Sequence, residues 1–254
     1  MADLIATSAL TKRFNGLTAV HEVDFHVRES QTTGVIGPNG SGKTTLFNLL
    51  SGFFPPSAGE IRFRGEPITL LPPHRRVALG IARTFQLVSV FSSLTVWENA
   101  VLAVLRFQPG GTAPGRFFLR SARRPAVLER CAEALERVGL AAQANLPVAE
   151  LSYGDKRMLE IGITLALQPR LLLLDEPLAG LSDHEIARVV ELIGEIRRRF
   201  TVVIIEHKIS KILELVERLS VMNEGRLICE GSPSEVLSDP RVRECYWGKE
   251  APAC

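Results

Sequence analysis

The chain has 254 residues, of which 46% are hydrophobic, and its formal net charge at pH 7 is +2. This length and composition allow one large hydrophobic core or two closely joined ones. The near-neutral charge argues against nucleic acid as a partner, and no apolar run reaches the ~18 residues that a membrane-spanning helix needs.

The start of the chain and its cysteines both bear on the compartment. Residues 1–4 lack the basic and apolar regions of a secretory signal. The four cysteines show no C-x-x-C spacing, so we expect neither disulfides nor a zinc site; they are Cys131, Cys229, Cys245 and Cys254. These features favour a protein of the reducing cytosol.

Residues 4–36 have the pattern of β structure. Val23, Phe25 and Val27 alternate with polar residues, as in a strand with one buried face. A second alternating run, Ile61 and Phe63 with arginines between and after them, follows a turn signal at residues 55–59. We therefore expect a small antiparallel sheet in the N-terminal part of the chain.

Between these runs lies a glycine-rich segment that leads from an apolar stretch into a helical one. It consists of Gly37, Pro38, Asn39, Gly40, Ser41, Gly42, Lys43, Thr44 and Thr45, with the G-x-x-x-x-G-K-[ST] spacing of a phosphate-binding loop. Glycines let backbone N–H groups converge on phosphate oxygens, and the following helix adds its positive end. Lys43 would neutralise the β- and γ-phosphates, and the Thr44 hydroxyl would bind Mg²⁺. The segment predicts a nucleotide site.

Residues 80–86 predict a short strand that ends on Gln86, after which the character of the chain changes. Residues 97–105 are helical in composition, and Val127, Cys131, Leu135 and Val138 recur at helical spacing before Gly139. A Pro/Gly-rich stretch at 108–115 and a basic run at 116–124 lie between these helices. We interpret residues 87–150 as an inserted helical subdomain. The basic run is either a solvated face or a contact with lipid headgroups or a partner.

From residue 152 onward an α/β pattern resumes. Buried strands are predicted at residues 171–174 and 201–205, and an amphipathic helix follows Ser182 and Glu185, which form a capping box. Residues 221–229 predict a closing hairpin. Alternating strands and helices imply a parallel sheet with right-handed crossovers. We therefore predict an α/β fold: a P-loop core of residues 1–86 and 151–254 that includes an antiparallel β subdomain, and the helical insertion.

Each predicted core strand ends on a polar group. Ligands of open parallel sheets gather at the carboxyl ends of the strands, so Gln86, Asp175, Glu176 and His207 should meet around the γ-phosphate. In this arrangement Asp175 would hold Mg²⁺, Glu176 would be the general base or orient water, and His207 would touch the γ-phosphate. Gln86 would contact Mg²⁺ or the attacking water.

Residues 151–155 precede a long predicted helix. Ser152 is placed to cap that helix and Asp155 is favourable against its dipole, and a capped N-terminus with a nearby glycine is also an anion site.

These elements stand in the order found in the ATPase subunits of ABC transporters, which the chain resembles nearly from end to end. The loop, Gln86 and residues 151–155 resemble Walker A, the Q-loop and the signature. Residues 171–177, 179–183 and His207 resemble Walker B, the D-loop and the switch histidine. Phe14 stands where an aromatic residue stacks on adenine in that family.

The resemblance implies a head-to-tail dimer with two ATP molecules at the interface. The signature residues of one subunit would then act on the ATP of the other; they are Ser152, Tyr153, Gly154 and Asp155. It also implies ATP and Mg²⁺ as cofactors, a related second ATPase subunit, and a transmembrane permease that docks on residues 87–99. A solute-binding protein would take part indirectly, and the protein would lie at the cytoplasmic face of the inner membrane.

A narrower match points to the branched-chain amino acid importer ATPases. It rests on Gly34 with the loop through Asn48, on residues 83–86, 151–155 and 159–161, and on Tyr246 with Gly248. Tyr153, Asp155 and Ser182 depart from the broad family pattern, which bears on the contacts between subunits.

Three alternatives remain at this point. Importers of urea or short amides share much of the pattern. A non-transport ABC ATPase of DNA repair or of ribosomes would need an insertion or a second cassette. A simple nucleotide kinase or GTPase would leave residues 151–155 and His207 without a role.

Overall fold

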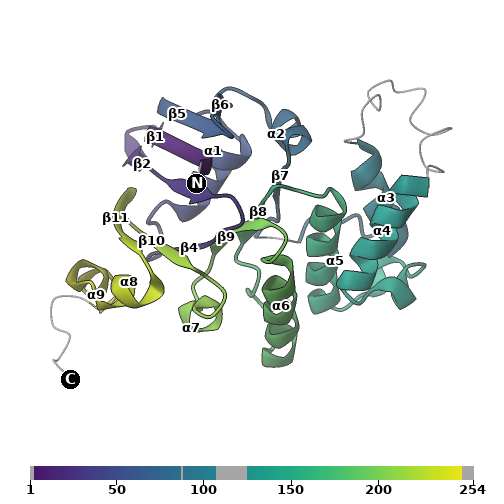
Figure 1. The fold of residues 1–254 in the computed structure, drawn as a ribbon. Coiled ribbons are helices and arrows are strands. Elements are labelled where there is room, and N and C mark those ends of the chain that lie inside the picture. The colour runs from purple at the N-terminus through teal and green to yellow at the C-terminus, as the bar shows by residue number, and fades with distance from the viewer. Residues whose placement is uncertain (1–2, 87, 107–124, 248–254) are drawn as a thin grey trace.

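The computed structural model describes residues 3–86, 88–106 and 125–247, whose strands form two sheets (Figure 1). The first has five strands in the order β2-β1-β5-β6, with β3 paired to β1, and all its pairs are antiparallel. Its strands are β1 Asp3–Phe14, β2 Leu17–Val23, β3 His26–Arg28, β5 Ala58–Phe63 and β6 Glu66–Pro67. This is the antiparallel sheet that the alternation of apolar residues predicts.

The second sheet has six strands in the order β11-β10-β4-β9-β8-β7. They are β4 Thr32–Ile36, β7 Ile81–Arg83, β8 Leu171–Asp175, β9 Thr201–Ile205, β10 Arg218–Asn223 and β11 Arg226–Gly231. All neighbours are parallel except the β10–β11 hairpin. Every residue of β4, β8 and β9 is buried, because helices and the other sheet cover both faces. The carboxyl ends of β4, β7, β8 and β9 consequently share one edge.

Nine α-helices and two short 3₁₀ turns connect these strands within the described residues. The α-helices are α1 Lys43–Ser51, α2 Pro73–Leu79, α3 Val96–Arg106, α4 Pro125–Arg137, α5 Tyr153–Ala166, α6 Asp183–Ile196, α7 Ile209–Ile212, α8 Pro233–Ser238 and α9 Pro240–Trp247; the 3₁₀ turns are Ala141–Gln143 and Val148–Glu150. The capping box predicted ahead of α6 is present: the backbone N–H and the hydroxyl of Ser182 both donate to Glu185 Oε2, at 2.9 and 2.7 Å. That cap fixes where α6 begins.

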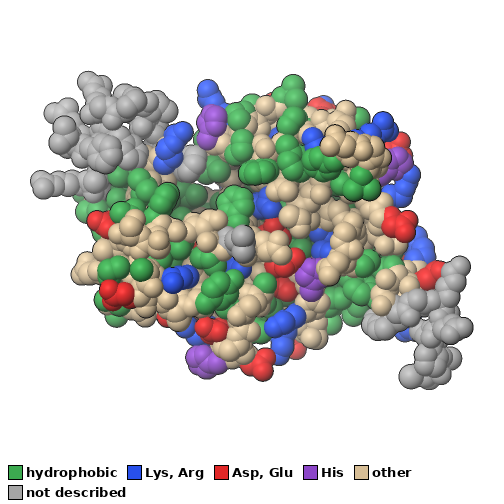
Figure 2. Space-filling model, turned by 180° about the vertical axis from the view of Figure 1, so that it is seen from behind, with side chains coloured by type: hydrophobic (Ala, Val, Ile, Leu, Met, Phe, Trp, Pro, Cys, Tyr) green, Lys and Arg blue, Asp and Glu red, His purple; other side chains and the backbone are tan. Residues whose placement is uncertain are grey.

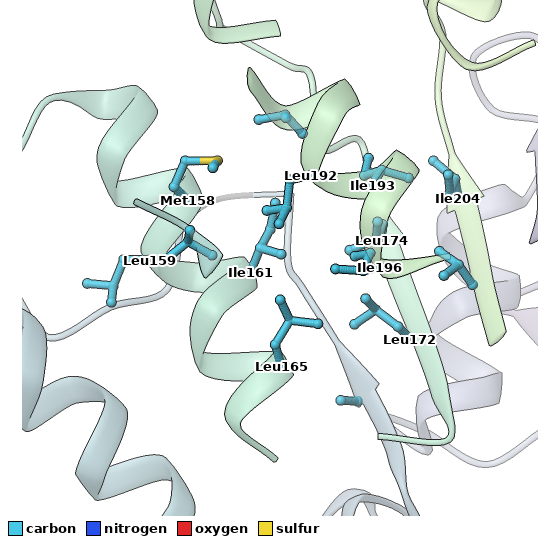
Figure 3. Packing of buried hydrophobic residues seen from close by; sticks show 14 of the residues in the cluster. Met158, Leu159, Ile161, Leu165, Leu172, Leu174, Leu192, Ile193, Ile196 and Ile204 are labelled. Atoms are coloured by element: carbon cyan, nitrogen blue, oxygen red, sulfur yellow. The ribbon is translucent and has the colours of Figure 1, made fainter. Parts of the chain in front are cut away.

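Helix α5 joins two parts of the molecule. On one side it packs on α3 and α4, where the predicted face of Val127, Cys131, Leu135 and Val138 is buried. On the other side its side chains meet those of β8 and α6, as Figure 3 shows for Leu165, Leu172 and Ile196, among others. The insertion boundary at residue 150 stays a prediction, since α5 belongs to both packings. The stretches at 108–115 and 116–124 lie outside the described residues.

The structure corrects two strand predictions. The alternating run at Val23, Phe25 and Val27 is buried as expected, but β2 ends at Val23 and β3 begins at His26, so two strands replace one. Strand β7 ends at Arg83 rather than beyond Phe85, although the Thr84 N–H still donates to the Leu173 carbonyl at 3.0 Å. Phe85 is half exposed, at 43%, because the chain has already left the sheet there.

Figure 2 shows acidic and basic side chains interspersed over one face of the molecule, as the small net charge leads one to expect. None of the helices in residues 3–86, 88–106 and 125–247 combines the length and the apolar character needed to span a bilayer.

Candidate nucleotide site

A cavity of about 670 Å³ lies at the carboxyl edge of the six-stranded sheet. Its walls come from the glycine-rich loop, the start of β2, the β10–β11 turn and the ends of β8 and β9. The lining residues are Phe14, Leu17, Thr18, Ala19, Asn39, Gly40, Ser41, Gly42, Lys43, Thr44, Thr45, Gln86, Glu176, His207, Glu224 and Gly225. The structure thus brings eight of the ten predicted nucleotide-binding residues to one cavity, together with three of the predicted groups at strand ends. Gly37 and Pro38 do not line this cavity.

The loop between β4 and α1 needs glycine at two positions for steric reasons. Gly37 and Gly42 have φ angles of 152° and 100°, which residues with a side chain rarely adopt. A Cβ at Gly42 would collide with the carbonyl oxygen of Ala19, and one at Gly37 with that of Met222. Close backbone packing under the loop therefore forces its curvature, which is what a phosphate cradle requires.

Lys43 begins α1 and folds its ammonium back over the loop. Its Nζ donates to the carbonyl oxygens of Gly37 at 2.9 Å and Pro38 at 3.0 Å. Burial lowers the pKa of Lys43, and the charges of Glu176 and Asp175 act in the opposite direction. The ammonium is thus a buried cation held by neutral carbonyls, ready to pair with a stronger anion such as a phosphate.

Glu176 follows the last residue of β8 and lies between two other predicted groups. Gln86 Nε2 donates to Glu176 Oε2 at 3.1 Å, and His207 Nε2 lies 3.0 Å from Glu176 Oε1. The φ of Glu176 is 46°, a left-handed conformation that is uncommon for a glutamate and often marks a functional position. Its backbone N–H donates to the Ile205 carbonyl at 3.0 Å, which anchors this turn to β9. The three side chains form one polar cluster on the cavity wall.

Asp175 lies deeper than Glu176 and does not line the cavity. It is 1% exposed, and its Oδ2 accepts from Arg83 Nη2 at 2.6 Å. Its Oδ1 is buried and has no hydrogen-bond partner among the described residues. Burial raises the pKa of Asp175, against the hydrogen bond and charge of Arg83. A buried carboxylate oxygen without a hydrogen-bond partner fits a hard divalent cation, which prefers oxygen ligands, so the residues present suit Mg²⁺.

Phe14 sits at the end of β1, on the rim of the cavity. Its side chain is 41% exposed, and its ring packs edge to face on Phe54 with 5.3 Å between centroids. Lys12 Nζ lies 5.1 Å from the Phe14 centroid. An exposed ring fixed from one side offers its other face to a planar ligand.

The segment Ser152, Tyr153, Gly154 and Asp155 lies outside the cavity, at the N-terminus of α5. Ser152 caps that helix as predicted, since its Oγ accepts from the Asp155 N–H at 3.0 Å. Asp155 also pairs with Arg188 of α6 at 3.1 Å. The tyrosine ring is 45% exposed. Within one chain, then, these four residues do not meet the cavity that Lys43 and Glu176 line.

Sequence reasoning missed two buried ionic groups that hold the site. Glu206 accepts from the N–H groups of Leu178 at 2.7 Å and His207 at 3.1 Å, and burial raises the pKa of Glu206. Arg157 of α5 donates to the carbonyls of Phe85 at 2.8 Å and Gln86 at 2.9 Å. These contacts join residues far apart in the chain. The one available signal was a charged residue inside an otherwise apolar helix or at a strand end.

Two family models match this chain. One, described as "ABC transporter", matches residues 20–179, and the other, described as "Branched-chain amino acid ATP-binding cassette transporter", matches residues 226–251. The first spans the loop, the Gln86 segment and β8, and the second spans β11, α8 and α9.

Curated proteins match over almost the whole length. The high-affinity branched-chain amino acid transport ATP-binding protein LivG of Salmonella typhimurium is 39% identical over 250 residues, 97% of this chain and 98% of LivG. The BraF protein of Pseudomonas aeruginosa, described by the same function, is 39% identical over 252 residues, with 97% and 98% covered. The lipopolysaccharide export system ATP-binding protein LptB of Acidithiobacillus ferridurans is 34% identical over 251 residues, with 98% and 99% covered.

Solved structures confirm the predicted fold. A nucleotide-free ATP-binding cassette from an ABC transporter has a TM-score of 0.85 at 30% identity, covering 98% of this chain and 100% of that chain. The ADP conformation of the cassette MJ1267 has a TM-score of 0.84 at 30% identity, again covering 98% and 100%.

Proposed function

The chain belongs to the ATP-binding subunits of ABC transporters, and we propose that it hydrolyses ATP to energise an importer of branched-chain amino acids. The assignment of the solute rests on the 39% identity of this chain, over nearly its full length, to LivG and BraF. The second family model, at residues 226–251, supports the same class independently of the catalytic motifs.

In this proposal ATP occupies the 670 Å³ cavity. Backbone N–H groups of the loop and of the first turn of α1 bind the β- and γ-phosphates, and Lys43 exchanges its carbonyl partners for phosphate oxygens. Phe14 packs on the adenine ring. Phe14 and the loop residues line the same cavity, which supports that assignment, because one nucleotide could then contact both.

Thr44 and Asp175 are the proposed ligands of Mg²⁺, with Gln86 as a further contact. When bound, the cation would neutralise charge that develops on the phosphate oxygens. The free Oδ1 of Asp175 supports this assignment.

We propose that the polar cluster of Gln86, Glu176 and His207 carries out hydrolysis. We assign Glu176 to accept a proton from the attacking water while the water oxygen bonds to the γ-phosphorus. The bond between that phosphorus and the bridging oxygen to the β-phosphate then breaks. His207 would contact the γ-phosphate, and Gln86 would help to position the water. The contacts of Glu176 with His207 and Gln86, at 3.0 and 3.1 Å, support a shared task for these three groups.

A second ATPase subunit would complete the site. Because Ser152, Tyr153, Gly154 and Asp155 lie outside the cavity of their own chain, we propose that they close over the ATP of a partner. A related second subunit is favoured over a second copy. Transmembrane permease subunits and, indirectly, a solute-binding protein would complete the transporter, with this chain peripheral at the cytoplasmic face of the inner membrane.

The alternative is an importer of urea or a short amide, because the permease and the binding protein select the solute. The 34% identity to LptB shows that related subunits also serve another cargo. Higher identity to LivG and BraF, together with the C-terminal family match, favours branched-chain amino acids.

The loop at residues 88–95 is the proposed docking site of the permease. Buried Asn99 fixes the backbone of Phe91: its Oδ1 accepts from the Phe91 N–H at 2.8 Å, and its Nδ2 donates to the Phe91 carbonyl at 3.0 Å. The Phe91 ring itself is 59% exposed. Because its backbone is fixed by hydrogen bonds and its ring is exposed, Phe91 is suited to insert into a pocket of a partner.

We expect Phe91→Ala to abolish most solute uptake while the isolated subunit keeps its ATPase activity. Loss of a buried aromatic anchor costs about 2 kcal/mol, or about 30-fold in affinity for the permease. The assay measures uptake of labelled leucine and urea in vesicles that contain the assembled transporter, and phosphate release by the ATPase subunits in the absence of the permease.

Leu70→Ala is the matched control, because that side chain is 83% exposed and lies just before α2, outside residues 88–95. It should leave leucine uptake intact. Uptake of urea but not of leucine by the unaltered transporter would contradict the proposed solute. Normal leucine uptake with Phe91→Ala would contradict the docking site.

A further inference from the structure

Arg83, at the end of β7, is almost completely buried and connects three parts of the site. Its side chain is 6% exposed. One arm of the guanidinium, Nη2, donates to Asp175 Oδ2 at 2.6 Å. The other arm, Nη1, donates to Asn48 Oδ1 at 2.7 Å and to Ser51 Oγ at 3.1 Å, both on α1.

The two arms therefore hold the two elements that carry the proposed metal ligands. Thr44 lies in the first turn of α1, and Asn48 lies one turn further on the same helix face. Asp175 is the last residue of β8. A rigid, planar guanidinium between Asn48 and Asp175 sets the spacing between α1 and the end of β8.

The position of the guanidinium is itself fixed. Its Cζ lies 5.6 Å from the ring centroid of Phe47 and 5.3 Å from that of Phe85, so aromatic rings confine it. The contact with Phe85 also links Arg83 to the residue next to Gln86. Since Arg83 engages only Oδ2 of Asp175, Oδ1 keeps its lone pairs free; it is buried and lacks a partner among the described residues.

We propose that Arg83 is a positioning residue for the metal–nucleotide complex: it braces α1 against β8 so that Thr44 and Asp175 face one Mg²⁺. This inference rests on the proposed function, because it presupposes a metal–nucleotide complex in the cavity. A positioning residue behind a metal ligand typically changes metal affinity by about 10- to 100-fold.

Electrostatic repulsion alone would change the metal affinity in the opposite direction when Arg83 is removed. A guanidinium beside a cation site repels the cation, so its removal would tighten metal binding if repulsion dominated. If Arg83 instead braces the site, its removal should weaken metal binding, because Asp175 loses the partner that fixes its orientation. The sign of the change therefore separates the two roles.

The test uses the full-length chain with ADP, and Mn²⁺ as a probe that is visible by electron paramagnetic resonance. We expect Arg83→Met to weaken Mn²⁺ binding in the ADP complex by about tenfold or more, with the affinity for ADP alone unchanged. Asn48→Ala removes the α1 arm only and should weaken Mn²⁺ binding in the same direction by a smaller factor. Arg83→Lys keeps the positive charge but not the two-armed guanidinium, and should lose less Mn²⁺ affinity than Arg83→Met.

Arg76→Met is the matched control. Arg76 is also buried, but it donates to the carbonyls of Leu49 and Leu50 at the other end of α1, at 2.6 and 2.9 Å. This variant should lower the melting temperature and leave the Mn²⁺ constant of the folded protein unchanged.

Unchanged or tighter Mn²⁺ binding in both Arg83→Met and Asn48→Ala would overturn the brace. If Arg83→Met does not fold, Asn48→Ala decides by the same criterion. Absence of Mn²⁺ binding to the unaltered chain with ADP would instead overturn the proposed metal site, and the brace with it.

Discussion

Replacing Glu176 with glutamine is expected to leave ATP binding intact while turnover falls by about a thousandfold, the scale of a lost general base. The amide has nearly the shape of the carboxylate and can still bond to Gln86 and His207, which lie 3.1 and 3.0 Å away. It cannot accept the proton of the attacking water. Phosphate release measures turnover, and retention of radiolabelled ATP measures binding.

Glu224→Gln is the control for this experiment. Glu224 lines the same cavity from the β10–β11 turn, but no role in hydrolysis is assigned to it. Its loss removes one carboxylate from the cavity and should keep turnover near the unaltered rate. Normal hydrolysis by Glu176→Gln would refute the role of Glu176.

The second large effect is expected from Lys43→Ala, which should weaken ATP binding by about 100-fold. Charge-assisted hydrogen bonds contribute ~1.5–3 kcal/mol each, and a buried ammonium has few competing partners. Among the described residues, the hydrogen-bond partners of Lys43 Nζ are the neutral carbonyls of Gly37 and Pro38. Titration with a fluorescent ATP analogue gives the dissociation constant.

Lys211→Ala serves as the comparison, because that exposed lysine of α7 does not line the cavity. An exposed charge of this kind changes binding by less than ~1 kcal/mol. An affinity of Lys43→Ala equal to that of Lys211→Ala would show that the loop binds phosphate without its lysine.

The parts of the fold that sequence predicts best are those with a local cause. The G-x-x-x-x-G-K-[ST] spacing located the loop because the backbone itself, at Gly37 and Gly42, excludes other residues. Residues 171–174 and 201–205 were recognisable as strands because strands buried on both faces must be uniformly apolar. The capping box at Ser182 marked the start of α6 for a similar reason.

What sequence did not predict depends on contacts between distant residues. Arg83 and Asp175 are 92 positions apart, and nothing in either local sequence indicates the pair. The end of β7 at Arg83 has the same origin. The pairing of β7 with β8 ends where Arg83 lies opposite Leu173. Beyond that point, the Phe85 N–H donates to Glu160 and the Phe85 carbonyl accepts from Arg157, so the chain leaves the sheet. Strand length was decided by the tertiary structure.

The catalytic cluster could be predicted from the sequence only in part. Strand order alone led us to expect Gln86, Glu176 and His207 at one edge of the sheet, and the structure places them in one cavity. The left-handed conformation of Glu176, with φ at 46°, was not foreseeable, since glutamate seldom adopts it. That conformation places the carboxylate between the amide and the imidazole.

The central claim is that the cavity is half of a site, which a second subunit must complete. The most direct test adds the related second ATPase subunit to a fixed, dilute amount of this chain and measures the ATPase rate, with light scattering to report mass. We predict that the rate rises in parallel with the formation of a two-subunit complex. A full rate per chain that stays constant while the protein is monomeric would contradict the account.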